Sequence, residues 1–131
     1  MPYTMIHNPK AGFVEAKVQG VISFSEIKEI FSKYVQMVAE KKCFLYLADY
    51  REAILDMSTM ELYALPKLMT DITAPLGVNV HRIKRAVVIA KGLKDKRLGD
   101  YRFYETVTLN RGQNTKLFED IDEARKWLSG E

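Results

Sequence analysis

The sequence is poor in the residues on which several common kinds of site depend. Its 131 residues include one cysteine, two histidines and one tryptophan. The single cysteine, Cys43, excludes an internal disulfide, and its place beside an apolar run predicts a buried thiol in a reducing compartment. The sequence shows no cluster with metal-ligand spacing, no glycine-rich phosphate loop and no nucleophile elbow. We therefore predict no metal, no cofactor and no catalytic residue.

Long apolar runs and a strong excess of one charge are also missing. The apolar runs are about as long as a β-strand, so no segment is expected to span a membrane. The first residues, MPYTMIHNPKAG, lack a basic stretch followed by an apolar one, so we expect no secretory signal and a cytoplasmic protein. A net charge of +3 is too small to indicate nucleic-acid binding. The length and a hydrophobic content of 47% predict one globular domain over residues 1–131.

Apolar patterning predicts five strands. Residues 3–8 and 13–18 are expected to form a hairpin, because the second segment alternates apolar and polar side chains. Continuous apolar runs at residues 44–48 and 85–90 are typical of strands buried on both faces. Residues 116–118 form a short last strand. Gly20 allows a bend, after which the second strand can continue.

Four helices are predicted between and after these strands. The first two begin at Ser-x-x-Glu capping boxes, at residues 23–26 and 58–61. Pro66 is expected to kink or split the second helix, because proline removes a backbone hydrogen bond and crowds the preceding turn. Residues 100–110 form the third helix, and Asp120 caps the fourth.

The predicted order is β-β-α-β-α-β-α-β-α. Alternation of strands and helices implies parallel pairing with right-handed crossovers. We therefore predict a single α/β domain with a mixed, mostly parallel sheet, flanking helices and an antiparallel first strand at the edge.

Several segments in this order point to a known family. They are the paired amino-terminal strands, LADYR at 47–51, AVVIA at 86–90, RFYE at 102–105 and LFEDIDEARKWL at 117–128. Together they resemble the STAS family of anti-sigma-factor antagonists, in particular its SpoIIAA-like branch of small bacterial proteins, over nearly the whole chain. The resemblance implies a SpoIIAA-like fold and a regulatory or binding role. The branch is also similar in topology to CRAL-TRIO lipid-binding domains, which raises a hydrophobic ligand as an alternative.

The resemblance also implies a place for regulation. In regulatory STAS domains a partner kinase phosphorylates a serine at the start of the helix after this strand. The best match here is Ser58, which follows Asp56 and has Thr59 beside it. The sequence departs from the regulators, because the loop from Asp49 to Ser58 is longer and no glycine follows the serine. We favour a purely structural role for Ser58, since a helix cap stabilises by ~1 kcal/mol.

The predicted binding region lies at the carboxyl ends of the strands. Asp49, Tyr50 and Arg51 follow the run 44–48 and would hold the loop in place. Lys94 and Arg97 should emerge at the same end of a parallel sheet and supply positive charge for an anionic ligand or an acidic partner. Ordinary solvated side chains would explain the same basic stretch, which comprises Arg82, Lys84, Arg85, Lys91, Lys94, Lys96, Arg97 and Arg102.

Methionine and tyrosine side chains around the Pro66 helix form a second candidate. They are Tyr50, Met57, Met60, Tyr63 and Met69. They would line a hydrophobic groove, form a homodimer surface or fill the core. We therefore expect a non-enzymatic binding or regulatory module that engages a protein or anionic ligand. A carrier of a lipid or other hydrophobic small molecule is the alternative, and an enzyme using acidic residues such as Asp49 and Asp56 ranks last.

Overall fold

The computed structural model describes residues 3–130, which form a five-stranded sheet between two unequal layers of helices. The strand order is β1-β2-β3-β4-β5. The antiparallel pair β1–β2 lies at one edge, and every other neighbouring pair is parallel. The predicted fold class, element order and antiparallel edge strand are confirmed. The strand bounds are β1 Tyr3–Asn8, β2 Phe13–Ser23, β3 Leu45–Asp56, β4 Lys84–Val88 and β5 Asn114–Phe118.

Local capping explains where three of the four helices begin. The helices are α1 Phe24–Lys41, α2 Thr59–Thr73, α3 Asp95–Asn110 and α4 Ile121–Ser129, with short 3-10 turns η1 Ala74–Leu76 and η2 Val80–Arg82 after α2. Ser23 and Ser58 each form the predicted capping box. The Asp120 carboxylate accepts hydrogen bonds from the first backbone N–H groups of α4. Lys94 precedes α3 and provides no side-chain cap.

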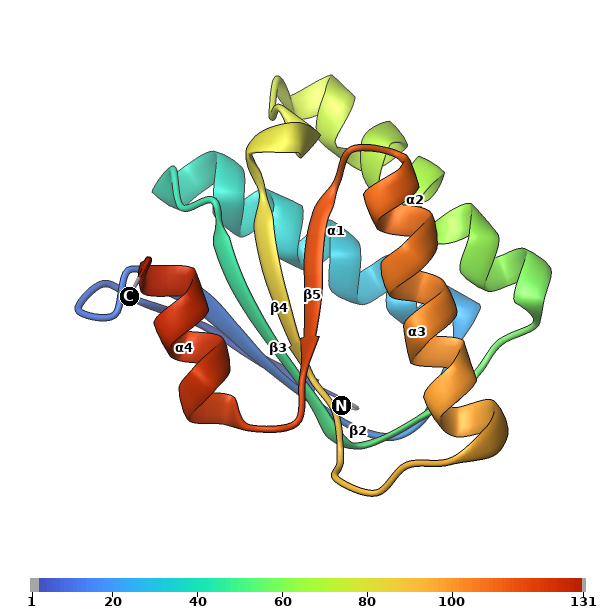
Figure 1. Cartoon of the computed structure of the whole chain (residues 1–131). Helices are drawn as coiled ribbons and strands as arrows, with labels where there is room; N and C mark the ends of the chain where they lie inside the picture. Colours follow the sequence, from blue (N-terminus) through green and yellow to red (C-terminus); the bar gives the residue numbers. More distant parts are fainter. Residues whose placement is uncertain (1–2, 131) are drawn as a thin grey trace.

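The two faces of the sheet are covered very differently (Figure 1). Helices α1, α2 and α3 pack on one face and enclose the large hydrophobic cluster, whose fully buried members include Ile30, Tyr34 and Met69. Helix α4 alone packs on the other face, where Leu47, Val88 and Leu128 belong to a much smaller cluster. The predicted buried Cys43 is confirmed, and its Sγ lies 3.3 Å from the Gly12 carbonyl oxygen.

Strand β3 extends much further than the sequence predicted. The segment from Asp49 to Ser58 was expected to be a loop, but β3 continues to Asp56. Between the pairs Lys17↔Asp49 and Gln19↔Glu52, β2 advances two residues and β3 advances three. This bulge in β3 places Arg51 and Glu52 both in solvent and breaks the alternation that would have marked a strand.

Two helix predictions also needed correction. Of the two outcomes predicted for Pro66, a kink or a split, the split does not occur, because α2 runs unbroken from Thr59 to Thr73 with Pro66 buried inside it. Packing of the ring in the core offsets the lost backbone hydrogen bond. Helix α3 begins at Asp95, five residues before the predicted start, so the basic segment after β4 is partly helical. Within residues 3–130 we find no helix long and apolar enough to cross a membrane.

Candidate functional site

The carboxyl edge of the sheet is stepped. Strand β4 ends at Val88, which pairs with Asp49, while β3 runs on to Asp56 beside β2 alone. Asp49, Tyr50 and Arg51 therefore lie within a strand at the step and not in a terminal loop. The predicted role of Asp49 and Arg51 in fixing a loop is wrong for this reason.

Asp49 and Arg51 form a two-pronged ion pair with each other. The Arg51 Nε and Nη2 atoms donate to the Asp49 Oδ1 and Oδ2 atoms at 2.9 and 2.8 Å, and the Arg51 backbone N–H also donates to Oδ1 at 3.1 Å. Burial raises the pKa of Asp49, but hydrogen bonds from Arg51 and its charge outweigh burial, so the pKa lies below its ordinary value. Asp49 is thus held ionised and satisfied by its neighbour.

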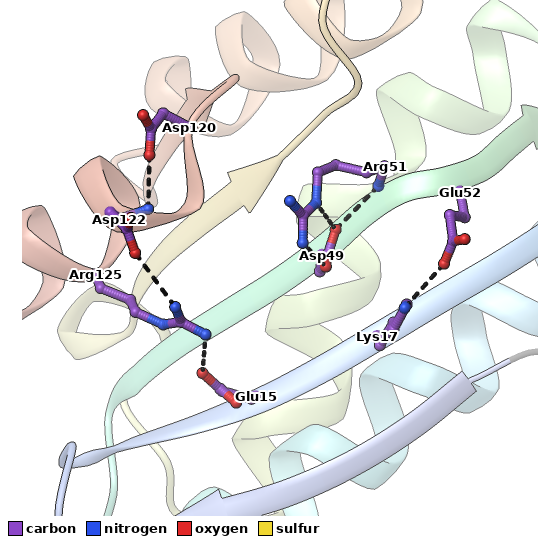
Figure 2. Close-up of polar contacts among 8 residues, drawn as sticks. All are labelled: Glu15, Lys17, Asp49, Arg51, Glu52, Asp120, Asp122 and Arg125. Atoms are coloured by element: carbon purple, nitrogen blue, oxygen red, sulfur yellow. Dashed lines mark hydrogen bonds and ion pairs between the residues drawn. The ribbon is translucent and has the colours of Figure 1, made fainter.

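The Asp49–Arg51 pair belongs to a row of ion pairs on the thinly covered face of the sheet (Figure 2). Lys17 Nζ lies 2.9 Å from Glu52 Oε2 on one side of it. On the other side, Arg125 of α4 reaches Glu15 of β2 at 3.3 Å. A hollow of about 290 Å³ lies between these side chains and α4. Because each charge in the row already has a partner, the row is well suited to covering the sheet and poorly suited to holding an anion.

Tyr50 points to the opposite face from Asp49 and Arg51. It is buried in the large cluster, with its ring 6.3 Å from that of Tyr101 in an edge-to-face arrangement. The structure therefore does not place Tyr50 on the predicted binding surface. The methionine and tyrosine group is divided in the same way, since Met57 and Met69 are buried and Met60 and Tyr63 are exposed.

A second hollow lies where the end of β3 meets the first turn of α3. It has a volume of about 230 Å³ and brings Ile54 and Asp56 together with Arg97. Lys96 also lines it, but its Nζ is 2.7 Å from the Asp100 carboxylate. Arg97 is exposed and has no ion pair or side-chain hydrogen bond within residues 3–130. Of the two predicted cations, Arg97 is therefore the one that lines the hollow at the end of β3 without an ion-pair partner among the described residues.

Ser58 and Thr59 lie just beyond this strand end and are exposed. The Ser58 Oγ accepts a hydrogen bond from the Glu61 backbone N–H at 3.1 Å, and Glu61 Oε1 accepts from the Ser58 N–H at 2.9 Å. The predicted structural cap is confirmed. Lys94 is exposed immediately before α3. The β3–α2 and β4–α3 connections both leave the sheet at the same edge (Figure 1).

Large apolar side chains are exposed along the same edge. Val21 and Ile54 pair across the ends of β2 and β3 and are 60% and 45% exposed. Met60 and Tyr63 in the first turns of α2 are 75% and 53% exposed. Large apolar side chains that are exposed close together and bordered by charge are typical of an interaction site.

The basic stretch does not form one surface. Arg82 lies over the Phe44 ring at 4.1 Å and Lys84 over the Trp127 ring at 4.3 Å, both at the amino end of β4. Arg85 is buried inside the domain. The predicted rim residues, Lys94 and Arg97, follow the carboxyl end of β4, and these three other cations are not part of that rim.

The most unusual interior group went unrecognised in the sequence. Arg85 Nη1 donates to the Tyr104 hydroxyl and Nη2 to Gln113 Oε1, each at 2.9 Å. The Gln113 Nε2 atom donates to the Pro66 carbonyl at 2.8 Å and so ties β4 to α2. A cavity of about 30 Å³ lies next to Arg85. The sequence feature that could have revealed this group is an arginine at the start of an apolar run that is predicted to be a buried strand.

No family model matches the chain, and no curated protein matches it. Among solved structures, the chain is similar to the phosphorylated form of the Bacillus cell fate determinant SpoIIAA. The two share 6% sequence identity, the match covers 95% of this chain and 98% of that chain, and the TM-score is 0.49. The α/β fold class rests on the strand order and register described above.

Proposed function

We propose that this chain is a binding module that docks a protein partner at the carboxyl edge of its sheet. The docking surface consists of Ile54, with Val21 paired beside it on β2, and of Arg97 and Lys94 at the start of α3. It would fit a partner segment that carries apolar side chains next to aspartate or glutamate. The observation that carries the proposal is the hollow at the end of β3, where exposed Ile54 lies beside the uncommitted charge of Arg97.

The physical argument combines two contributions. Exposed apolar side chains gain free energy when a partner removes them from water, by roughly 25 cal/mol per Å². A guanidinium at the rim of such a patch selects acidic partners and raises their association rate more than it tightens binding. The Asp49–Arg51 pair does not contribute, because the two groups already satisfy each other.

A regulatory switch at this surface would act through Ser58 or Thr59. A phosphate on Ser58 would meet the free N–H groups at the start of α2, which favour an anion. It would also face the Glu61 carboxylate, which now accepts from the Ser58 N–H. We infer that phosphorylation here would break the capping box and change the charge of the docking edge. The intact mass of the protein purified from its own host, followed by peptide mapping, tests this inference.

The interior is less suited to the carrier role than the edge is to docking. The cavity beside Arg85 has a volume of about 30 Å³, whereas small-molecule pockets usually occupy roughly 300–1,000 Å³. The acidic residues proposed for an enzyme are also separated, since Asp49 pairs with Arg51 and Asp56 lies seven residues further along β3. Residues 3–130 contain no group of three or more His, Cys, Asp or Glu side chains placed to hold a metal ion.

The decisive experiment compares the proteins that co-purify with three forms of the chain from its own host. The test variant changes Lys94 and Arg97 to glutamate. The control changes Lys28 and Lys33 to glutamate, which alters the net charge equally on exposed positions of α1. We expect a partner that co-purifies with the wild type and the control to be lost from the test variant. Its affinity for the purified test variant should fall at least tenfold.

Other outcomes would point elsewhere. Equal retention of every partner by the two variants would show that the edge is not the docking surface. Native mass spectrometry of the same preparations provides an independent check, because a bound small-molecule mass would favour the carrier role. A bare polypeptide mass that doubles without a partner would indicate a homodimer.

A further inference from the structure

The large core contains an apolar pocket that its side chains do not fill completely. This core pocket has a volume of about 30 Å³ and is lined by residues of β3, β4 and the helices α1, α2 and α3, among them Phe31, Leu65 and Val87. Its accessible lining is almost wholly apolar, because the hydroxyls of Tyr46 and Tyr101 are buried in the surrounding packing. Water finds few hydrogen-bond partners in such a space, so an apolar group that displaces it gains free energy.

Leu55 marks the place where the core pocket reaches the surface. It is half-buried, whereas every other side chain of the lining is buried. Leu55 and Tyr101 also line the hollow of about 230 Å³ at the end of β3. The core pocket therefore opens beside Leu55 into the hollow that belongs to the proposed docking surface. A group that a partner inserts into the hollow would meet the core pocket behind it.

The volume of the core pocket restricts what can enter it. About 30 Å³ has room for two water molecules, since one water needs about 10–15 Å³ by the same measure. An apolar cavity that holds a benzene ring has a volume of about 150 Å³. The core pocket thus suits the branched end of one aliphatic side chain and is too small for an aromatic ring.

The charges at the mouth of the core pocket indicate what should accompany this side chain. Lys96 pairs with Asp100, whereas Arg97 has no ion pair among residues 3–130. Burial raises the pKa of Tyr101 to about 12, and the charge of Arg97 opposes this rise, as expected for a guanidinium close to the mouth. Asp56 borders the same hollow from β3. An incoming carboxylate is therefore expected on the α3 side of the hollow, at Arg97.

We propose that the core pocket is the anchor site for one leucine or valine side chain of a protein partner, next to an acidic residue that pairs with Arg97. This inference rests on the proposed function, because it names the partner segment that the carboxyl edge would hold. Interfaces concentrate much of their binding energy in a few anchors that fill pockets, surrounded by contacts that exclude water. Ile54 and Val21 would provide those surrounding contacts, and the charge of Arg97 would select the acidic neighbour.

Blocked tripeptides serve as probes of the anchor site. Asp-Leu-Asp is titrated into the isotope-labelled full chain and followed by NMR, and it should shift the signals of Leu55 and Val87 and give nuclear Overhauser contacts from its leucine methyls to both. It should bind at least tenfold more tightly than Asp-Ala-Asp, which lacks the buried methyl groups, and more tightly than Asp-Phe-Asp. Asn-Leu-Asn should bind about two- to fivefold more weakly, because it loses one solvated ion pair.

A matched pair of variants separates the core pocket from the rest of the core. Val87 lines the core pocket, whereas the neighbouring Val88 belongs to the small cluster on the other face of the sheet. Val87→Ile adds one methyl group to the core pocket and should weaken Asp-Leu-Asp at least tenfold. Val88→Ile adds the same group on the opposite face and should leave the affinity unchanged. Ala48→Val fills the core pocket from β3 and replaces Val87→Ile if that variant does not fold.

Four results would overturn the anchor site. They are equal affinities for Asp-Leu-Asp and Asp-Ala-Asp, equal affinities of wild type and Val87→Ile for Asp-Leu-Asp, tighter binding of Lys-Leu-Lys than of Asp-Leu-Asp, and a wild-type dimer that Val87→Ile makes monomeric. The last result would assign the core pocket to a second copy of the chain. The Lys94 and Arg97 glutamate variant distinguishes the two proposals. If it loses a host partner that Val87→Ile retains, docking at the edge stands and the anchor fails, and if both variants retain every partner, both proposals fail.

Discussion

The two faces of the sheet are covered by different kinds of side chain. On the face under α1, α2 and α3, every strand contributes apolar side chains to one continuous core. On the other face, α4 covers only Leu47, Val88 and their neighbours, and the uncovered part carries the row of ion pairs from Glu15 to Glu52. Where no helix covers the sheet, its surface consists of charged side chains that pair with one another and face the solvent.

This difference has a consequence for binding. The row of ion pairs is balanced in charge, whereas the carboxyl edge combines exposed Ile54 with Arg97, which has no ion pair among residues 3–130. A surface whose charges are already paired gains little free energy from binding a partner. A surface with exposed apolar groups and an unpaired charge gains more. The thickly covered face is therefore expected to dominate stability, the ion-pair row to add little, and the edge to bind.

The largest contrast should come from the same substitution made on each face. Leu62 of α2 is 1% exposed in the large cluster, and Leu128 of α4 is 3% exposed in the small one. Leu62→Ala should lower the free energy of unfolding by about 3–5 kcal/mol, because the three packed helices prevent the cavity from collapsing. Leu128→Ala should cost less, about 2–3 kcal/mol, because a short helix that covers its face alone can shift to refill the space.

Urea denaturation of both variants measures this contrast. Ile6→Ala is the control, because Ile6 is 57% exposed on the uncovered part of the sheet and should change stability by less than about 0.5 kcal/mol. Equal losses for Leu62→Ala and Leu128→Ala would mean that α4 is as firmly held as the other three helices.

A smaller loss is expected from the polar connection inside the large core. Gln113→Leu would remove the hydrogen-bond partner of Arg85 Nη2 and one donor to the Pro66 carbonyl, which would keep its bond from the Thr70 hydroxyl. We expect a loss of about 2–3 kcal/mol, since a buried group that loses its hydrogen bond costs about 1–3 kcal/mol. Gln36→Leu, at an exposed position of α1, is the matched control. A stability equal to wild type would mean that water replaces the Gln113 amide.

These residues show what could be predicted from the sequence. Strand order and the starts of α1, α2 and α4 were predictable because periodicity and side-chain caps such as that of Ser58 are local features. The extension of β3 was not, because the bulge sets Arg51 and Glu52 in solvent together and hides the strand pattern. The burial of Arg85 was also hidden, because its neutral partners Tyr104 and Gln113 lie 19 and 28 residues away in the chain.

The ion-pair row should respond to pH through Asp49. Its folded pKa lies below the ordinary value, which is about 3.9 in an unfolded chain. The unfolded state therefore binds the proton more readily, so the stabilisation is present above about pH 4 and is lost as pH falls through the folded pKa. Asp49→Asn removes this contribution, and we expect it to lower stability by about 1 kcal/mol at pH 7 because Arg51 is partly solvated.

The measurement is urea denaturation of wild type and Asp49→Asn at pH 7, 5, 4 and 3. The difference between the two proteins should stay constant from pH 7 to 5 and shrink as the pH falls below about 4. A difference that is the same at every pH would assign the effect of the substitution to packing rather than to the charge of Asp49.

The smallest effect should come from the most solvated pair of the row. Lys17 and Glu52 are 55% and 59% exposed, so water and salt screen their attraction at 2.9 Å. A double-mutant cycle with Lys17→Ala and Glu52→Ala should give a coupling energy of only about 0.2–1 kcal/mol, falling further in 1 M salt. If the coupling instead exceeds that of the Asp49–Arg51 pair, the exposed row holds the β2–β3 extension in place. The thin face would then contribute to stability in its own right, and the contrast drawn between the two faces would not hold.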